Sequence, residues 1–314
     1  MLEEELVKDL FMHDLLSHLN EVSHEKYRTY LERKLKEKSY DRNNIFINNR
    51  NYMAILEYNS PASELLSNKT YYIFKASCPD SKKCLELLKI IKESLDPGSL
   101  VIFRISTENY PLISALTHTG AILTETQIIY LLKRDKMNLE YVMNMREKYL
   151  DRAFHPGLND LETIKQLIRI SFKNYPNRFS VDPFLKRNIT VELYEKWAES
   201  VIKKSMDGGA FALVVREEKG KPCAGAFEEI KEDRDFEEIF NLRTGEFLLY
   251  FSHPECRGKN YYTMITSYGL KIFYDLGIDY VITETHIDNR YPQYVWVKQG
   301  FRPVYSRYTF NLHL

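Results

Sequence analysis

The part of the chain best suited to chemistry is a short polar loop between an apolar strand and a helix. The run FLLYF at 247–251 predicts the strand, and apolar residues spaced by three and four from Tyr262 onward predict the helix. The loop between them reads HPECRGKN, at 253–260. The first N–H groups of a helix have no partner within the helix, and Arg257 and Lys259 add positive charge. This loop therefore suits an anion such as a pyrophosphate, although many α/β proteins have such a loop without a ligand.

A second set of polar side chains lies on a predicted strand at 281–287. Because side chains alternate along a strand, Glu284 and His286 share one face. Either could take the proton that an attacking ammonium must lose, which is the role of a general base. The alternative is a paired or solvated polar residue, and Asp288 and Asn289 can equally shape the following turn and helix cap.

These two motifs together resemble a known family. PECRGKN at 254–260 looks like the P-x-x-R-G-x-G segment of the GNAT (GCN5-related) N-acetyltransferases. TETHIDN, separated by ten residues from Gly300 and Phe301, resembles their later strand, Asn, helix and Gly-Phe signature. The resemblance covers residues 154–314. Within it, SFKNYPNRFSVDP (171–183) and LYEKW (193–197) are most similar to the branch that acetylates nucleotide-linked amino sugars, such as the dTDP-fucosamine acetyltransferases.

The resemblance implies a splayed mixed sheet, with the thioester of acetyl-CoA between the strands at 247–251 and 281–287. Main-chain N–H groups of 257–262 would hold the pyrophosphate. Those near 249–251 would hold the pantetheine and polarise the thioester carbonyl as an oxyanion hole. The cofactor-binding residues assigned in this way are Leu249, Tyr250, Phe251, Arg257, Gly258, Lys259, Asn260, Tyr261, Tyr262 and Asn289.

Two positions depart from the family pattern. Asn260 replaces the last glycine of the loop, and Asn tolerates left-handed backbone geometry better than most residues. Trp296 stands four residues before Gly300, where the family often has a Tyr that protonates the leaving thiolate. An indole cannot serve as that acid, so Tyr294, Tyr291 or a water must replace it. The catalytic candidates are therefore Glu284, His286 and Tyr294.

An internal repeat extends the prediction to the first half of the chain. VIFRISTEN at 101–109 aligns without gaps with VITETHIDN at 281–289. Each copy continues with Tyr and Pro just after the Asn, and reaches a glycine, Gly120 or Gly300, eleven residues after it. Chance similarity of short strands is the alternative, but order and spacing both favour duplication.

The predicted fold class is α/β, an α+β mixed sheet built from tandem GNAT-like domains. Residues 1–150 form a degenerate domain that opens with helices, and residues 151–314 form the acyl-CoA-binding catalytic domain. The loop ASCPDSKKC at 76–84 lacks an Arg-Gly pair. The first half is therefore expected to support or cover the second half and to bind no CoA.

Composition points to a small-molecule partner. The chain of 314 residues has 44 basic and 44 acidic side chains, so no net field would recruit nucleic acid or an anionic membrane. The N-terminus is acidic where a signal peptide needs positive charge, and a cytoplasmic monomer or homodimer is expected. The four cysteines form no CxxC pair, so free thiols, without disulfides or any metal site, are expected.

The leading functional hypothesis is an acetyl-CoA-dependent N-acyltransferase that acetylates a primary amine of a small molecule, with a nucleotide-linked amino sugar as a candidate acceptor. A catalytically silent GNAT-like module that binds ligand without turnover is the first alternative. A protein-interaction scaffold without affinity for acyl-CoA is the second.

Overall fold

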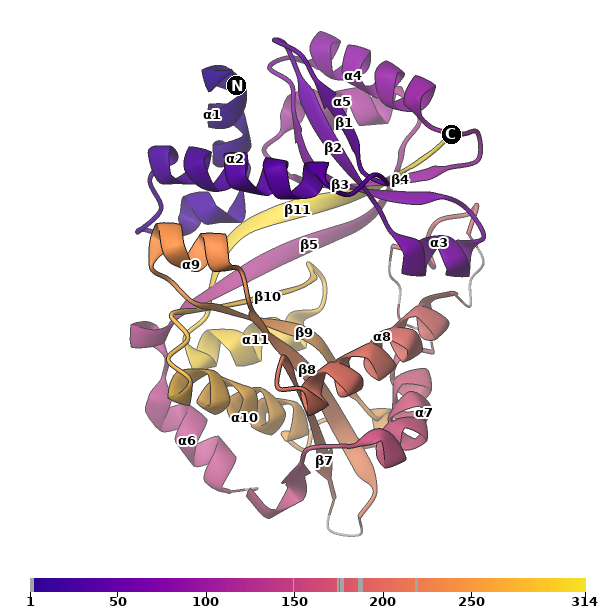
Figure 1. Cartoon of the computed structure of the whole chain (residues 1–314). Coiled ribbons are helices and arrows are strands. Elements are labelled where there is room, and N and C mark those ends of the chain that lie inside the picture. The colour runs from indigo at the N-terminus through magenta and orange to yellow at the C-terminus, as the bar shows by residue number, and fades with distance from the viewer. Residues whose placement is uncertain (1–2, 149, 174, 176–177, 186–188, 218–219) are drawn as a thin grey trace.

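The computed structural model describes residues 3–148, 150–173, 175, 178–185, 189–217 and 220–314 (Figure 1). In the first half, the strands are β1 (Ile45–Asn48), β2 (Met53–Tyr58), β3 (Thr70–Ser77), β4 (Leu100–Ser106) and β5 (Ile122–Lys133). The helices of this half are α1 (Glu4–Met12), η1 (Leu15–His18), α2 (His24–Ser39), α3 (Ser60–Leu66), α4 (Ser81–Ser94) and α5 (Tyr110–His118). They are followed by η2 (Arg134–Lys136), α6 (Leu139–Glu147) and η3 (Leu150–Arg152).

In the second half, the strands are β6 (Ala153–Phe154), β7 (Ala210–Arg216), β8 (Pro222–Lys231), β9 (Thr244–Ser252), β10 (Tyr280–His286) and β11 (Arg302–His313). The helices are η4 (Leu158–Asp160), α7 (Leu161–Phe172), α8 (Ile189–Met206), α9 (Arg234–Phe240), η5 (Pro254–Cys256), α10 (Tyr261–Asp275) and α11 (Arg290–Gln299). Among the described residues, no helix is both long and apolar enough to cross a membrane.

A mixed sheet runs through both halves and joins them by an exchange of strands. In the described part of the chain it has eleven strands, in the order β1-β2-β3-β4-β11-β5-β10-β9-β8-β7-β6. The last strand of each half lies next to strands of the other half: β11 is inserted between β4 and β5, and β5 between β11 and β10. In Figure 1 these two long strands cross the centre of the molecule side by side. The two halves therefore share one hydrogen-bonded ladder.

The sequence repeat corresponds to a structural repeat. In the first half, β3, α4, β4, α5 and β5 follow one another in the same order as β9, α10, β10, α11 and β11 in the second. In each unit the helix that precedes the final strand is followed by a glycine in the left-handed region, Gly120 at φ 81° and Gly300 at φ 105°. A left-handed residue ends a helix, and glycine adopts this conformation without steric cost. This is why both copies keep a glycine at that position.

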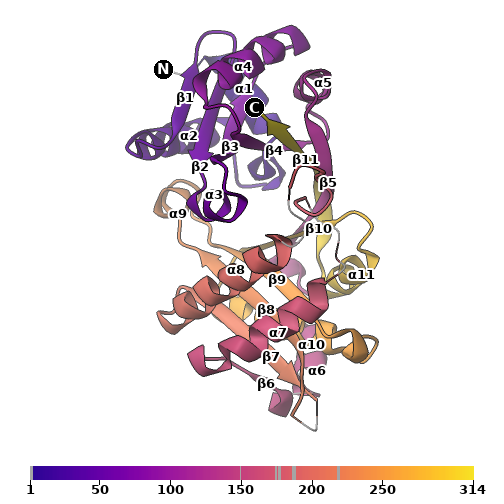
Figure 2. The ribbon, with the colours of Figure 1, turned by 90° about the vertical axis from the view of Figure 1, so that its right-hand side faces the viewer.

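Helices cover both faces of each half. In the first half, α4 and α5 bury Leu87, Leu88 and Leu112 against one face of the sheet, while α1 and α2 cover the other face together with α9 of the second half. In the second half, α7 and α8 pack on one face of β7, β8 and β9 (Figure 2), and α10 packs on the opposite face. The amphipathic spacing of their apolar residues places the apolar sides of these helices in the cores.

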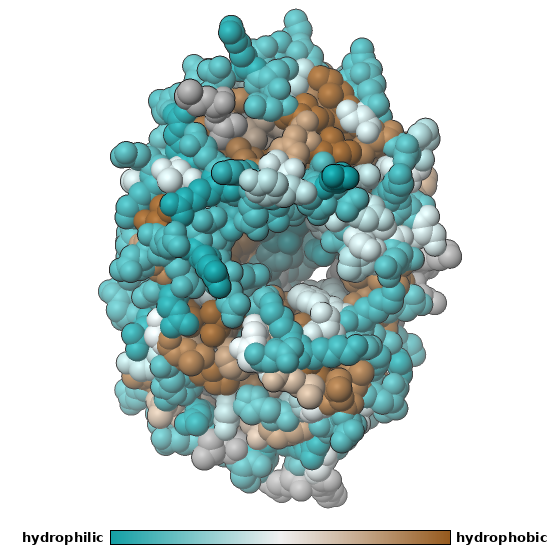
Figure 3. Space-filling view, in the orientation of Figure 1, coloured by the Kyte–Doolittle hydropathy of each residue, from teal (hydrophilic) through white to brown (hydrophobic). Residues whose placement is uncertain are grey.

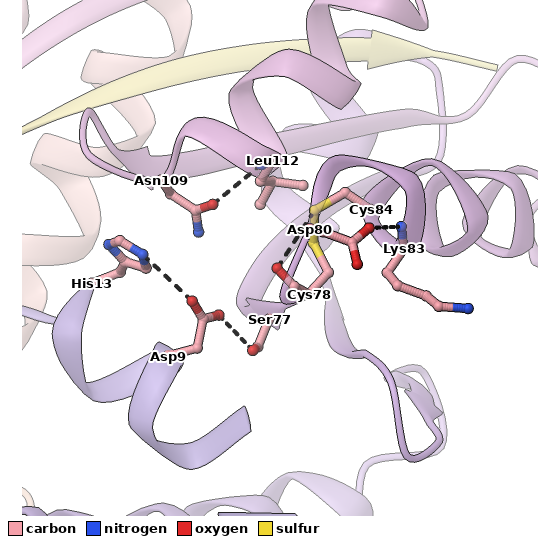
Figure 4. The surroundings of a disulfide bond; sticks show 9 residues. All are labelled: Asp9, His13, Ser77, Cys78, Asp80, Lys83, Cys84, Asn109 and Leu112. Carbon is pink, nitrogen blue, oxygen red and sulfur yellow. Dashed lines mark hydrogen bonds and ion pairs between the residues drawn. A yellow bond between two sulfur atoms is a disulfide. The ribbon is translucent and has the colours of Figure 1, made fainter. Parts of the chain in front are cut away.

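The cysteines correct one expectation. Instead of four free thiols, the structure has disulfides between Cys78 and Cys84 and between Cys223 and Cys256. The first pair closes the turn from β3 into α4 (Figure 4). The second pair is 33 residues apart in the chain and meets because β8 pairs with β9, which brings the loop after β9 back to the start of β8. Neither spacing resembles a CxxC motif, so the prediction failed for lack of a local signal.

Candidate functional site

The two strands predicted to flank the thioester separate from each other. Strands β9 and β10 are parallel, but they pair only over a short stretch. In it, residues 280–282 of β10 pair with residues 244–246 of β9. Beyond this point β9 stays hydrogen-bonded to β8 and β10 stays hydrogen-bonded to β5, so a gap opens between them. A cavity of about 430 Å³ lies at this gap, against the start of α10. We refer to it as the first cavity.

The first cavity contains most of the predicted cofactor residues. Those that line it are Tyr250, Phe251, Arg257, Gly258, Asn260, Tyr261, Tyr262 and Asn289. Leu249 lines a neighbouring cavity instead, and Lys259 is an exposed residue that lines neither. Further lining residues that the sequence did not suggest are Ser171, Phe172 and Tyr175 from the end of α7 and beyond.

The N-terminus of α10 is open toward the first cavity. Asn260 adopts the left-handed conformation at φ 62°, as its side chain allows, and within the described residues no side chain caps the helix. Gly258 also has a positive φ, of 77°, and a Cβ there would meet nothing within 4 Å. The first turn of α10 therefore lacks the side-chain cap that a polar N-cap residue usually supplies. The partial positive charge of its first N–H groups suits an anion.

The matching helix of the first half is closed. Asp80 caps α4, and its carboxylate accepts a hydrogen bond of 2.9 Å from the N–H of Lys83. Asn109 caps α5 in the same way, with 3.2 Å to the N–H of Leu112. Figure 4 shows both caps close to the Cys78–Cys84 disulfide. In the second half, Asn289 does not cap α11, and its amide donates instead to Thr285 Oγ1 at 2.9 Å. The first half therefore fills with its own side chains the positions that the second half leaves open.

A second cavity of about 360 Å³ adjoins the first. The residues common to both walls are Phe172, Tyr175, Tyr250, Tyr262, Asn289 and Pro292. The first half of the chain contributes Arg104 from β4 and Glu125 and Gln127 from β5 to the wall of the second cavity. This is a consequence of the strand exchange, which places β5 beside β10. In the space-filling view the surface is hollowed between the two halves (Figure 3).

The two predicted base candidates, Glu284 and His286, both line the second cavity. Glu284 is paired through both carboxylate oxygens: Arg104 bonds to one and Arg307 to the other. Gln127 also donates to Glu284, at 3.2 Å. His286 Nδ1 lies 3.2 Å from the backbone N of Asp288. Thr283 and Thr285 also line this cavity, but burial alternates along β10, with the two threonines buried and Glu284 and His286 half-buried, as the predicted alternation requires.

Tyr294, the predicted acid, does not line either cavity. It is 61% exposed on the outer side of α11, where the Lys298 ammonium lies 4.3 Å from the centre of its ring. Trp296, at the family's tyrosine position, is 2% exposed and packs between Tyr130 and Phe301. The tyrosines that do line both cavities are Tyr175, Tyr250 and Tyr262, at positions that the sequence did not single out as acids.

Tyr250 is held by a buried carboxyl group. Its hydroxyl donates a hydrogen bond to Glu228 of β8, which is 0% exposed. Burial raises the pKa of the Glu228 carboxyl to about 8, because a charge in the core loses its hydration. Gly269 of α10 provides the space, since a Cβ at Gly269 would overlap the Glu228 carboxyl group. Burial also raises the pKa of Tyr250 well above its usual range, so its hydroxyl stays protonated.

Sequence reasoning missed the side chains that come from outside the two motifs. Arg104 and Gln127 lie on strands that the sequence assigned to a different domain, and Arg178 follows α7 in a segment of irregular structure. One signal was present: the repeat aligns Arg104 of the first half with Glu284 of the second, and both turn out to face the second cavity. In the branch motif at 171–183, residues 174, 176 and 177 lie outside the described residues.

Comparison with known proteins identifies the fold. The sequence matches no protein-family model, and no curated protein matches it in sequence. Among solved structures, a GCN5-related N-acetyltransferase from Sphaerobacter thermophilus matches with a TM-score of 0.52 and 11% identity, over 83% of this chain and 76% of that one. A GCN5-related N-acetyltransferase from Kribbella flavida matches with a TM-score of 0.52 and 11% identity, over 90% of this chain and 94% of that one. A functionally unknown conserved protein from Staphylococcus epidermidis matches with a TM-score of 0.51 and 12% identity, over 89% of this chain and 97% of that one.

At such identities the likeness concerns the fold. The chain has the fold of the GCN5-related N-acetyltransferases, and the predicted α/β class with a mixed sheet is confirmed. Its own internal repeat gives this fold a tandem form. Fold similarity does not determine activity, so the function has to be argued from the two cavities.

Proposed function

We propose that this protein transfers an acetyl group from acetyl-CoA to a primary amine of a small molecule. In this reaction the amine nitrogen attacks the thioester carbonyl carbon and the C–S bond breaks. The products are an amide, the CoA thiol and the proton that the ammonium loses before attack. Acetyl-CoA would occupy the first cavity and the amine the second. A nucleotide-linked amino sugar is a candidate acceptor.

The observation that carries this proposal is the open N-terminus of α10 at the gap between β9 and β10. Arg257 and the N–H groups of the first turn offer an anion site for a pyrophosphate. The free edge of β9 after Glu246 offers main-chain N–H groups to a pantetheine arm. Because Asp80 closes the matching position of the first half, we propose one CoA per chain.

The second cavity supplies groups for proton transfer. Glu284 has both oxygens occupied by guanidinium groups, so we assign it a positioning role for Arg104 and Arg307. His286 accepts the backbone N–H of Asp288 through Nδ1, so the neutral ring carries its own proton on Nε2. We propose His286 as the general base, which takes up the ammonium proton at Nδ1 after releasing this hydrogen bond. Tyr262, which lines both cavities and which burial keeps protonated, is proposed as the donor to the leaving thiolate.

A silent ligand-binding module remains the second candidate, because two features weaken the acid role expected of α11. The indole of Trp296 occupies the family's tyrosine position in the core, and Tyr294 faces away from both cavities. Such a protein would bind CoA and release no thiol.

Thiol release and calorimetry distinguish these functions. The full-length protein is titrated with CoA, and then incubated with acetyl-CoA and a panel of small primary amines while free CoA thiol is measured. An acetyltransferase binds one CoA and releases thiol with at least one amine at a rate above hydrolysis. Binding without release supports the silent module. Absence of CoA binding refutes both functions.

A further inference from the structure

Three arginine side chains gather at one part of the second cavity. Arg104 of β4 and Arg178 of the segment after α7 line it, and Arg307 of β11 adjoins them without lining it. Their proximity is electrostatically unfavourable: burial, followed by the charge of Arg178, lowers the pKa of Arg104 to about 10. Burial and the charge of Arg104 also lower the pKa of Arg307 well below its usual range. A fold gains nothing from three buried guanidinium groups in one place unless anions compensate them.

The carboxylates of the cavity pair with these arginines to different degrees. Glu284 is shared by Arg104 and Arg307. Glu125 faces Arg178, but the two approach only to 3.7 Å, which is longer than a hydrogen bond. Lys231 pairs with Glu246 at 2.6 Å. Along the wall, Arg104, Arg178 and Lys231 thus balance Glu125, Glu284 and Glu246 in charge, and the incomplete contact is the one between Arg178 and Glu125.

Hydrogen bonding at this wall is also incomplete. Nε of Arg104 and Oε2 of Glu125 are buried and have no hydrogen-bond partner among the described residues, and the same holds for Nε of Arg178. Unpaired buried polar atoms are costly, so native structures pair nearly all of them. The side chains of Arg104 and Arg178 still expose 24% and 23% of their surface. Both residues line the cavity, so an anion bound there can supply hydrogen-bond acceptors to their guanidinium groups.

We propose that the acceptor amine carries an anionic group, a carboxylate or a phosphate, which binds Arg178 and Arg104. This inference rests on the proposed acetyl transfer and names the chemical class of its acceptor. Guanidinium groups bind both oxyanions through paired N–H donors, which fixes the orientation of the ligand as well as its position. With its anion at the wall formed by β4 and β5, the acceptor extends its amine toward Tyr175 and Tyr250, where the second cavity meets the first.

The first half of the chain then has a defined task in recognition. It provides no CoA site, but Arg104, Glu125 and Gln127 form the part of the acceptor cavity that is far from the thioester. The strand exchange places β5 in hydrogen-bonded register with β10, with Gln127 directly opposite His286. Recognition of the acceptor thus uses Arg104 of the first half together with Arg178 of the second, whereas activation of the thioester is assigned to the second half alone.

The test uses matched pairs of amines that differ in charge. The pairs are 4-aminobutyrate with 4-aminobutan-1-ol, and glucosamine 6-phosphate with glucosamine. With acetyl-CoA and the full-length protein, we expect the anionic member of at least one pair to show a kcat/KM at least tenfold above its neutral partner. The pair that shows the preference distinguishes carboxylate from phosphate. Equal values within both pairs, a preference for the neutral members, or CoA binding without reaction of any member overturns the inference.

Substitution of Arg178 tests the assignment to this residue. Arg178→Gln should raise KM for the anionic amine tenfold or more while kcat stays within about threefold, and Arg178→Lys should recover part of the loss. Arg169→Gln serves as the matched control, because Arg169 lies on exposed α7 surface and pairs with Glu195 and Glu162 outside the cavity. An unchanged KM in Arg178→Gln overturns the assignment. CoA affinity, measured by calorimetry in each variant, separates this outcome from failure of the proposed function, which would show as absent CoA binding in the unmodified protein.

Discussion

The buried carboxyl group of Glu228 gives the stability of this protein a specific pH dependence. Its pKa is raised to about 8 in the fold, against an ordinary value of 4.5, because the side chain is fully buried, while the hydrogen bond from Tyr250 lowers this pKa in part. Below pH 4.5 both the folded and the unfolded chain hold this proton. Between 4.5 and 8 the unfolded chain releases it and the folded chain keeps it, so stability falls as the pH rises. Above 8 the loss is complete and constant.

The size of the effect follows from the two pKa values. The interval between 4.5 and 8, at about 1.4 kcal/mol per pH unit, corresponds to a loss of about 5 kcal/mol of unfolding free energy, which is an upper bound. Glu228→Gln keeps the shape and an acceptor for Tyr250 but removes the titration. We expect the variant to be as stable as the original protein within about 1 kcal/mol at pH 4.5, and more stable by several kcal/mol at pH 9.

Urea denaturation, followed by tryptophan fluorescence at a series of pH values from 4.5 to 9, measures this difference. Glu229→Gln is the matched control, because the adjacent residue on β8 pairs with Lys204 and Lys231 outside the core. The control should keep the pH dependence of the original protein. If the original protein and Glu228→Gln lose stability in parallel between pH 5 and 8, the Glu228 carboxyl group is not protonated in the fold and the reasoning fails.

Four further predictions concern the site and its frame. Gly258→Asp should lose most of the CoA affinity in calorimetry while circular dichroism stays unchanged, because the change places a carboxylate at the open start of α10 and strains a residue with φ 77°. Unchanged affinity would show that the loop does not hold the pyrophosphate. His286→Gln should lower kcat about a hundredfold and Glu284→Gln should mainly raise the KM of the acceptor; near-original rates in both across the pH profile would move the base elsewhere or to water. Dividing the chain near residue 150 should give two fragments that are poorly soluble when expressed alone, since each lacks a strand of its sheet, and that regain CoA binding when co-expressed. A fully active fragment 150–314 would contradict the shared sheet. Reduction of the Cys223–Cys256 disulfide should lower the unfolding free energy by up to about 4 kcal/mol, because it opens a loop of 33 residues in the unfolded chain. The variant Cys78→Ser/Cys84→Ser is the control that leaves this loop intact, and equal stability with and without reductant would argue against the bond.

Local patterns were sufficient to predict the elements that carry the phosphate loop. The helical spacing after Asn260 and the apolar run before His253 correspond to α10 and β9 within a few residues. The aligned copies at 101–109 and 281–289 became β4 and β10 in equivalent places. These predictions succeeded because periodicity and turn residues are properties of short segments.

What remained hidden depends on contacts between distant segments. No local pattern states that β11 pairs with β4 rather than with its own half, since both strands offer the same alternating faces. The arginine wall of the second cavity was missed for this reason. The Cys223–Cys256 disulfide was missed because 33 residues separate its cysteines. Asp80, by contrast, could have been recognised as a helix cap from the sequence CPDSKK, and with it the closed state of the first half.

The exchange of strands also sets the order in which the molecule can be completed during synthesis on the ribosome. Strand β11 is translated after every other strand, yet it fills the space between β4 and β5. Until it emerges, β4 keeps an unpaired edge that can pair with other chains. The sheet of the first half therefore stays incomplete until the second half has been translated. Such a nascent chain depends on slow elongation or on chaperones that shield the open edge.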